Sequence, residues 1–190
     1  QAALDCAVAS TVRVPAMPGP WVVAPPPGGG GELDPATGKV WRTTALNFSL
    51  ASNTRVVFEP GCVVEAERWA FHEVRAPLAI VGSLYAPVHN LTIVGDGAEW
   101  RMHKRDYQNA SCELGAAASR TCYAYSEWRH GLSLWWGIDV AVRGLRIADT
   151  GGDGVLLGGM EGGGGDRSNV VALTQRATLS NLTCDGNHRQ

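Results

Sequence analysis

Apolar residues recur along this chain in short alternating runs separated by Gly, Pro, Asn and Asp. The clearest example, RGLRIADTGGDGVLL from Arg143 to Leu157, predicts a strand, a turn and a second strand. Thr54 to Ala66 places two β-branched runs around a Pro-Gly pair, and Leu78 to Tyr85 continues in the same style. Helical periodicity is weak, with plausible helical turns near 65–73 and 113–120. The pattern predicts an all-β fold.

One six-residue pattern occurs three times: apolar, polar, Asn or Gly, Leu, polar, apolar. The three stretches are Val88–Ile93, Val142–Ile147 and Leu179–Cys184. The alternation slips by one residue at Asn90, Gly144 and Asn181, and these residue types tolerate a left-handed backbone. The slip therefore predicts a bend that returns the apolar set to one interior. Because the intervals between the stretches are unequal, we expect a solenoid whose coils carry loops.

The first part of the chain, residues 1–39, alternates short apolar pieces with Pro and Gly and includes PPPGGGG at 25–31. This composition predicts a tail or linker. The alternative is an irregular N-terminal cap over the first coil, anchored by Trp21 and Cys6. At 190 residues the chain can hold one sizeable core. We therefore expect one β domain over residues 40–190 behind that tail or cap.

Several segments together resemble a known family. They are VVFEPGCVVEA, NLTIVGDGAEWRMHKRDY, EWRHGLSLWW, RGLRIADTGGDGVLL and CDGNHRQ. Between about residues 54 and 190, this series is similar to the rungs of proteins of the pectate-lyase-like superfamily. The resemblance implies a right-handed parallel β-helix. In similar sequences Asn-His-Arg-Gln is followed by Gly and another apolar strand, whereas this sequence stops at Gln190, so we expect a truncated stack, incomplete at its C-terminus.

Composition excludes some function classes and favours others. The balance of 16 basic and 18 acidic residues gives a formal charge of -2, which provides no basic face for nucleic acid. No apolar run approaches the roughly 18 residues that span a bilayer, so no membrane span is expected.

Asn-x-Ser/Thr sequons fit a secreted or cell-surface glycoprotein. They lie at Asn47, Asn90, Asn109 and Asn181. Asn90 and Asn181 have a backbone reason at the bends, which makes Asn47 and Asn109 the better glycosylation candidates. The number of cysteines is odd, at five, so at least one thiol lacks a partner within the sequence. Cys112 and Cys122 flank a short polar loop and form the expected disulfide.

Outward side chains of stacked coils form ladders about 4.8 Å apart, so residues of different coils can converge on one surface. The candidate catalytic residues are Asp149, Asp153, His188, Arg189, His130 and Arg129. For β-elimination from a uronic acid polymer, calcium or Arg neutralises the substrate carboxylate, and Lys, Arg or His removes the proton. Glycoside hydrolysis needs two carboxylates, about 5 to 5.5 Å apart for retention or 6.5 to 9.5 Å for inversion. The structural alternative is that Asp149, Asp153 and the glycines form a turn, that His188 and Arg189 line a turn, and that His130 is a satisfied wall residue.

Further candidates concern metal and sugar binding. Asp149, Asp153 or Asp185 are the candidate ligands of a calcium ion, and no Cys/His spacing suggests zinc. For sugar binding, the candidates are Trp135 and Trp136, by aromatic stacking, and Lys104 and Arg105, which begin the longest insertion. The alternatives are core packing for the tryptophans and a solvated loop for the two cations.

The sequence therefore favours an extracellular carbohydrate-binding β-helix, part of a polysaccharide lyase, epimerase or hydrolase acting on an acidic polysaccharide. The alternative is a non-catalytic adhesion or structural component of a cell-surface or extracellular assembly. Whether the chain is an enzyme stays open. In an enzyme, Asp149, Asp153, His188 and Arg189 face one space, whereas in an assembly protein turn hydrogen bonds consume them.

Overall fold

The computed structural model describes residues 11–24, 32–33, 40–41, 52–68, 71, 77–82, 87–108, 129–161 and 170–189. Within these ranges the chain consists mostly of strands in parallel sheets, which confirms the all-β prediction. The described helix is the short α2 (Lys104–Gln108). In the described part of the chain, no helix has the length and apolar character needed to cross a membrane.

The chain passes along the same sheets repeatedly, and we call each passage a rung. The first rung holds β1 (Thr11–Val14) and β2 (Trp21–Val23), and the second holds β5 (Arg55–Phe58), β6 (Val63–Ala66) and β7 (Ala79–Val81). The third holds β8 (Val88–Arg101) and β9 (Leu132–Leu134), and the fourth holds β10 (Gly137–Ala148) and β11 (Val155–Leu157). The fifth holds β14 (Gln175–Ser180) and β15 (Thr183–Asp185). Two antiparallel pairs lie outside the rungs, β3 (Glu32–Leu33) with β4 (Val40–Trp41), and β12 (Gly159–Glu161) with β13 (Val170–Leu173).

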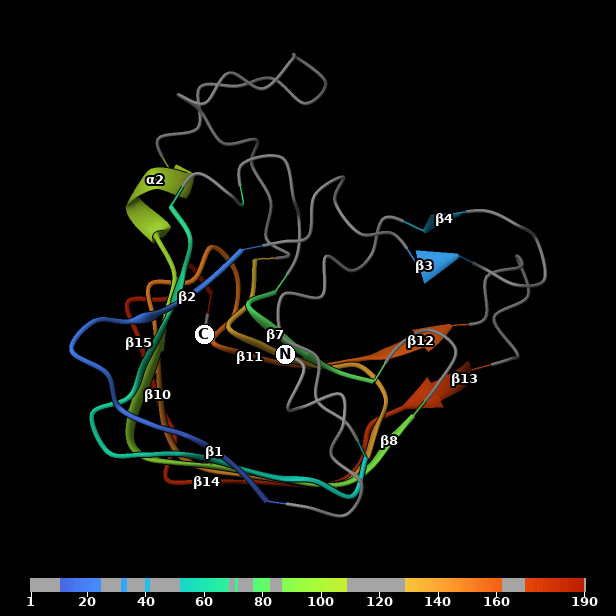
Figure 1. Ribbon diagram of the computed structural model, residues 1–190. Coiled ribbons are helices and arrows are strands. Elements are labelled where there is room, and N and C mark those ends of the chain that lie inside the picture. The colour runs from blue at the N-terminus through green and yellow to red at the C-terminus, as the bar shows by residue number, and fades with distance from the viewer. Residues whose placement is uncertain are drawn as a thin grey trace.

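Successive rungs pair in parallel around one interior. One sheet runs in the order β1, β5, β8, β10, β14, and β2, β6 and β15 pair with the same sheet. A further sheet has the order β11, β9, β7. The long strands β8 and β10 turn a corner, so each contributes to two walls, and Figure 1 shows the rungs overlaid along these walls.

The predicted bend at Gly144 is confirmed. Gly144 has a φ of 70°, and the register of β10 against β8 shifts there. Val142 and Ile147, on either side of the bend, are both buried, as are the Leu145 and Ile147 side chains that the pattern assigned to the core. Asn181 lies at the same corner in the fifth rung with a φ of 50°.

The predicted alignment of Asn90 with this corner is wrong. Asn90 does bend the chain, with a φ of 50°, but its neighbours in register are Asn53, Asp139 and Arg176. Val88 pairs with Gly137 rather than with Val142. In the second to fifth rungs two corners each contain a residue with a left-handed backbone between alternating apolar residues, and the local pattern does not distinguish the two corners.

Residues 11–24 belong to the sheet, an arrangement that agrees with the alternative of a cap over the first coil rather than with a tail. β1 pairs with β5 and β2 with β6, in the same parallel arrangement as the later rungs. The prolines between these strands, Pro15, Pro18 and Pro20, lie in a corner, where a missing N–H costs no sheet hydrogen bond. The indole Nε1 of Trp21 donates to the Pro15 carbonyl at 2.8 Å across that corner. Cys6 lies outside the described residues.

Apolar side chains fill the space between the walls. Phe58 and Trp100 meet edge to face with ring centroids 5.2 Å apart, and both are buried. The predicted helical turn near 65–73 is wrong at its start, because residues 65–66 belong to β6. The predicted turn near 113–120 lies outside the described residues. The observed helix α2 instead opens the long insertion, where Tyr107 packs on the core.

Candidate functional site around Asp153

The turn at residues 149–154 is held by hydrogen bonds to the next rung. Thr150 is buried, and its backbone N–H donates to Oδ1 of Asn187 at 3.1 Å. Its hydroxyl donates to the Gly152 carbonyl at 2.8 Å. Gly151 packs so closely that an added Cβ would stand 2.8 Å from the Tyr107 ring. Thr150 and Gly151 therefore have structural reasons for their identity.

Asp153 and His130 form a close pair in the wall beneath the turn. The backbone N–H of Asp153 donates to Nδ1 of His130 at 2.9 Å, and the carboxylate Oδ2 lies 3.2 Å from the same nitrogen. The His130 side chain is 4% exposed and that of Asp153 15%.

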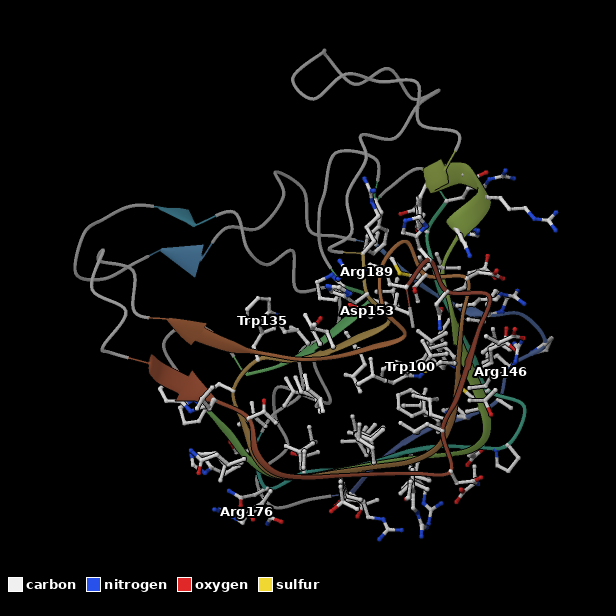
Figure 2. The ribbon with its side chains drawn as sticks, turned by 180° about the vertical axis from the view of Figure 1, so that it is seen from behind. Trp100, Trp135, Arg146, Asp153, Arg176 and Arg189 are labelled. Carbon is white, nitrogen blue, oxygen red and sulfur yellow. The ribbon has the colours of Figure 1, made fainter. Side chains whose placement is uncertain are left out.

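Arg189 reaches the same carboxylate from the next rung. Its Nε lies 3.8 Å from Oδ1 of Asp153, and the two residues form an isolated parallel bridge. The Arg189 side chain is 50% exposed, so the guanidinium is accessible to solvent. Figure 2 shows Arg189 and Asp153 together on one side of the stack. His188 is exposed beside them, and its backbone N–H donates to the Thr150 carbonyl at 3.1 Å.

Arg129 does not reach this surface. It is fully buried, its Nε donates to the Phe71 carbonyl at 2.9 Å, and its guanidinium lies 5.0 Å from the centre of the Tyr107 ring. Arg129 therefore lies away from the surface on which Arg189 is exposed, and its candidate catalytic role stays a prediction. The hydrogen bond and the cation–π contact of Arg129 stabilise the packing behind the turn at residues 149–154.

The three candidate calcium ligands do not gather. Among the described residues, no three His, Cys, Asp or Glu side chains are arranged to hold a metal ion. The carboxylate of Asp185 instead accepts from Arg146 at 2.5 Å, and this hydrogen bond raises the pKa of Arg146. Figure 2 shows Arg146 on a different wall from Asp153. For Asp149, the backbone N–H donates to the Asp185 carbonyl at 3.0 Å, which fixes the turn.

The predicted sugar contacts lie at two places. Lys104 adjoins the site, because its Nζ donates to the Asn187 carbonyl at 2.9 Å, and Arg105 follows it as an exposed residue of α2. Trp135 and Trp136 are half-buried residues that follow β9. An added Cβ on Gly158 would stand 3.5 Å from the Trp135 ring, so that ring packs against the neighbouring rung.

Sequence reasoning missed Asn187. This residue is buried, its Oδ1 accepts from the Thr150 N–H, and its Nδ2 donates to the Ile147 carbonyl at 3.3 Å. An Asn between Gly and His signals a turn, and nothing local indicates that its side chain points inward. Asn187 fastens the rung that carries His188 and Arg189.

Comparison with protein-family models, with curated proteins and with solved structures finds no match. The functional argument therefore rests on the geometry around Asp153.

The remaining candidates concern glycans and cysteines. Asn90 and Asn181 are exposed, and Nδ2 of Asn90 donates to Oδ1 of Asn53 at 3.3 Å. Glycosylation at either stays a prediction. Three sets of candidates lie outside the described residues: Asn47, Asn109, and the Cys112 and Cys122 pair. Cys62 and Cys184 carry free thiols, and burial raises the pKa of both.

Proposed function

We propose that this chain is a right-handed parallel β-helix, secreted or at the cell surface, that binds an acidic polysaccharide beside Arg189. The parallel register of the five rungs supports the fold. One observation carries the function: the half-exposed guanidinium of Arg189 lies beside the partly buried carboxylate of Asp153, which in turn contacts the buried His130. The reaction class we propose is that of a lyase or epimerase.

Each group has a role in that chemistry. Arg189 binds the carboxylate of a uronic acid, because a guanidinium presents paired donors to two carboxylate oxygens. This contact neutralises the charge that otherwise opposes removal of the adjacent carbon-bound proton. His188, exposed and next in the chain, takes that proton as the general base. In a lyase the electron pair of the C–H bond forms the new double bond while the C–O bond to the leaving sugar breaks, and water protonates the released oxygen. In an epimerase a proton returns to the same carbon from the opposite face. His130 is too deeply buried to meet a sugar, so it and Asp153 position Arg189.

The hydrolase option has less support. It requires two carboxylates on either side of one glycosidic bond. Here Asp153 faces His130 and Arg189, whereas Asp185 is bound by Arg146 on another wall. Elimination needs one cation and one base. Arg189 is the proposed cation, and His188, next to it in the chain, is the proposed base.

A second function, a non-catalytic component of an extracellular assembly, is favoured by one specific observation. Hydrogen bonds already engage the polar groups of Thr150 and Asn187 and the backbone of the turn. They lie within the turn and between it and the next rung. Such a turn keeps its shape without any ligand.

The test uses the purified chain with pectin and with alginate. Unsaturated products absorb in the ultraviolet, and binding is followed separately by calorimetry. Arg189→Ala is expected to lose binding and product formation, and His188→Ala to lose product formation while it keeps binding. The matched control is Arg143→Ala, because the Arg143 side chain is 51% exposed and lies 3.7 Å from a carboxylate, that of Asp96.

The outcomes separate the two functions. Binding that depends on Arg189 but yields no unsaturated product or epimerised residue supports the non-catalytic function. Equal loss in the Arg143→Ala and Arg189→Ala variants would show a diffuse charge effect and refute the site. No binding of either polymer overturns the proposal for these substrates.

A further inference from the structure

The outward side chains of one wall include positive charges and no negative ones. On the wall formed by β1, β5, β8, β10 and β14, the alternate residues that do not enter the core face outward. They form two columns in register: Thr11, Arg55, Thr92, Ala141 and Thr178, and Arg13, Val57, Val94, Arg143 and Ser180. Three of these ten residues are Arg, and none is Asp or Glu.

Two of the three arginines have no carboxylate partner. Arg13 and Arg55 are exposed, and neither forms an ion pair with another residue that the structure describes. Arg143 differs, because its guanidinium lies 3.7 Å from a carboxylate oxygen of Asp96. The charges of Arg13 and Arg55 are therefore available to an external anion, whereas that of Arg143 is compensated within the chain.

The neighbouring wall, built from β6, β15 and the second halves of β8 and β10, neutralises its own charges. Arg101 pairs there with Glu65 of the preceding rung. Arg146 contacts Glu99 on one side and Asp185 on the other. Figure 2 shows Arg146 on that wall. Outward arginines of this stack can thus be paired between rungs, and the wall that carries Arg13 and Arg55 departs from this arrangement.

We propose that Arg13, Arg55, Thr11 and Thr92, which we call the arginine face, bind a linear polysaccharide that carries sulfate esters. Arg55 lies between Thr11 and Thr92 in one column, about 4.8 Å from each at the backbone. Arg13 lies one strand and two residues from Arg55, a diagonal of about 8 Å. The two guanidinium groups bind two sulfates of one polymer, and the threonine hydroxyls exchange hydrogen bonds with sugar hydroxyls.

The chemistry of the face favours a sulfated polymer over other anions. A guanidinium is weakly hydrated and presents paired donors, and a sulfate ester is a weakly hydrated anion with several acceptor oxygens. The four residues include no aromatic or large apolar side chain, which contact with a lipid surface or an apolar peptide would require. Two cations are also too few to hold a nucleic acid duplex at physiological salt.

The arginine face is separate from the site around Asp153. Figure 2 shows Asp153 and Arg189 together, away from the wall on which Arg176 of β14 lies. The inference goes beyond the proposed function and does not depend on it. A uronic acid polymer at Arg189 and a sulfated polymer at the arginine face are different ligands on different walls, so substitutions can separate them.

The experiment measures binding of dextran sulfate and of alginate to the whole chain by calorimetry, with uncharged dextran as the polymer control. Arg13→Gln and Arg55→Gln should each weaken dextran sulfate binding by about three- to tenfold, and the double variant by about ten- to a hundredfold. Each should also make binding less dependent on salt, because a guanidinium that contacts a sulfate releases counterions from the polymer. Arg143→Gln is the matched control and should change binding by less than about twofold, since Asp96 already pairs with Arg143.

The outcomes distinguish this face from the site around Asp153. Arg189→Ala should keep dextran sulfate binding, and the double variant should keep alginate binding. Arg55→Lys, which keeps the charge without the paired donors, should bind dextran sulfate less tightly than the unsubstituted chain. An unchanged thermal unfolding midpoint confirms that each variant is folded.

Three results would overturn the proposal: no binding of dextran sulfate, full binding by the double variant, or equal losses in the Arg143→Gln and Arg55→Gln variants. A chain that binds dextran sulfate through Arg13 and Arg55 but does not bind alginate would support the arginine face and count against the proposed function.

Discussion

Nδ1 of His130 meets Asp153 at two atoms, the backbone nitrogen at 2.9 Å and the carboxylate Oδ2 at 3.2 Å. The backbone contact is a hydrogen bond in which the imidazole accepts. His130 therefore holds the turn from beneath, while the carboxylate of Asp153 extends toward Arg189.

This relationship predicts different effects of two substitutions at His130. The amide oxygen of Asn offers an acceptor close to the place of Nδ1, whereas Ala offers none. A buried N–H without an acceptor costs about 1–3 kcal/mol. His130→Ala should lower the free energy of unfolding by at least that amount, and His130→Asn by less, as measured by urea denaturation. Equal losses in the two variants would show that packing, not the hydrogen bond, is what His130 contributes.

Asn187 should be as important to stability as its burial suggests. Asn187→Ala leaves the Thr150 N–H without its acceptor and should lower the free energy of unfolding by about 1–3 kcal/mol. The Thr150 amide should also exchange its hydrogen faster, which nuclear magnetic resonance can follow. Ser180→Ala, at an exposed position of the same rung, is the control and should change stability by less than about 0.5 kcal/mol. Unchanged exchange at Thr150 would contradict the assignment.

Gly144 should not tolerate a side chain. Its φ is 70°, and an added Cβ would stand 2.9 Å from Cα of Asp96. Gly144→Ala is therefore expected to cost more than about 1 kcal/mol of stability, because both the backbone angle and the contact oppose it. Gly19→Ala is the matched control, since no atom lies within 4 Å of its added Cβ. A thermal unfolding midpoint equally insensitive to both substitutions would refute the strain.

The Asp139 and Arg176 pair predicts a pH effect. Nε of Arg176 donates to Asp139 at 2.5 Å, and this hydrogen bond lowers the pKa of Asp139. Because the folded pKa lies below the ordinary value, the pair stabilises the fold above that ordinary value, about 3.9. The contribution is lost as the pH falls through the lower, folded pKa.

A titration of the Asp139 carboxyl resonance should therefore show a midpoint below that of an ordinary aspartate. Arg176→Gln should move the midpoint up toward the ordinary value. Added salt should have the same direction of effect, because both side chains are more than half exposed and their attraction is screened. A midpoint that is the same with Arg176 and with Gln would exclude the pairing in solution.

Local patterns were sufficient for part of the fold. The alternation on either side of Gly144 predicted the bend and the burial of Leu145 and Ile147, because a left-handed residue between alternating runs has one consequence whatever surrounds it. The turn at 149–154 was equally recognisable from its Gly and Asp content. Within the candidate site, Asp153 contacts both His130 and Arg189, but His130 is buried and does not lie on the outer surface where the ladder argument placed it.

Long-range pairing decided the rest. Asn90 and Gly144 carry the same local signal, yet they occupy different corners, since only the register between rungs assigns a residue to a corner. The sequence did not predict strands β1 and β2, because the prolines near them indicated a tail. Those prolines lie in the corner between the two strands. The single-sequence pattern contains no register information, and this is why the alignment of the first repeat was wrong.

By itself, the sequence determined the all-β character, the bend at Gly144 and the chemical types gathered near Asp153. Tertiary structure alone decided which of those groups reach solvent. Arg129 and His130 are adjacent polar residues, yet both are buried. Arg129 donates to the Phe71 carbonyl and lies over the Tyr107 ring, and Nδ1 of His130 accepts from the Asp153 N–H. Arg189 is half exposed, although its Nε lies 3.8 Å from Oδ1 of Asp153. Burial of a polar side chain depends on contacts with residues that are distant in the sequence. A local pattern of residue types carries no information about those contacts.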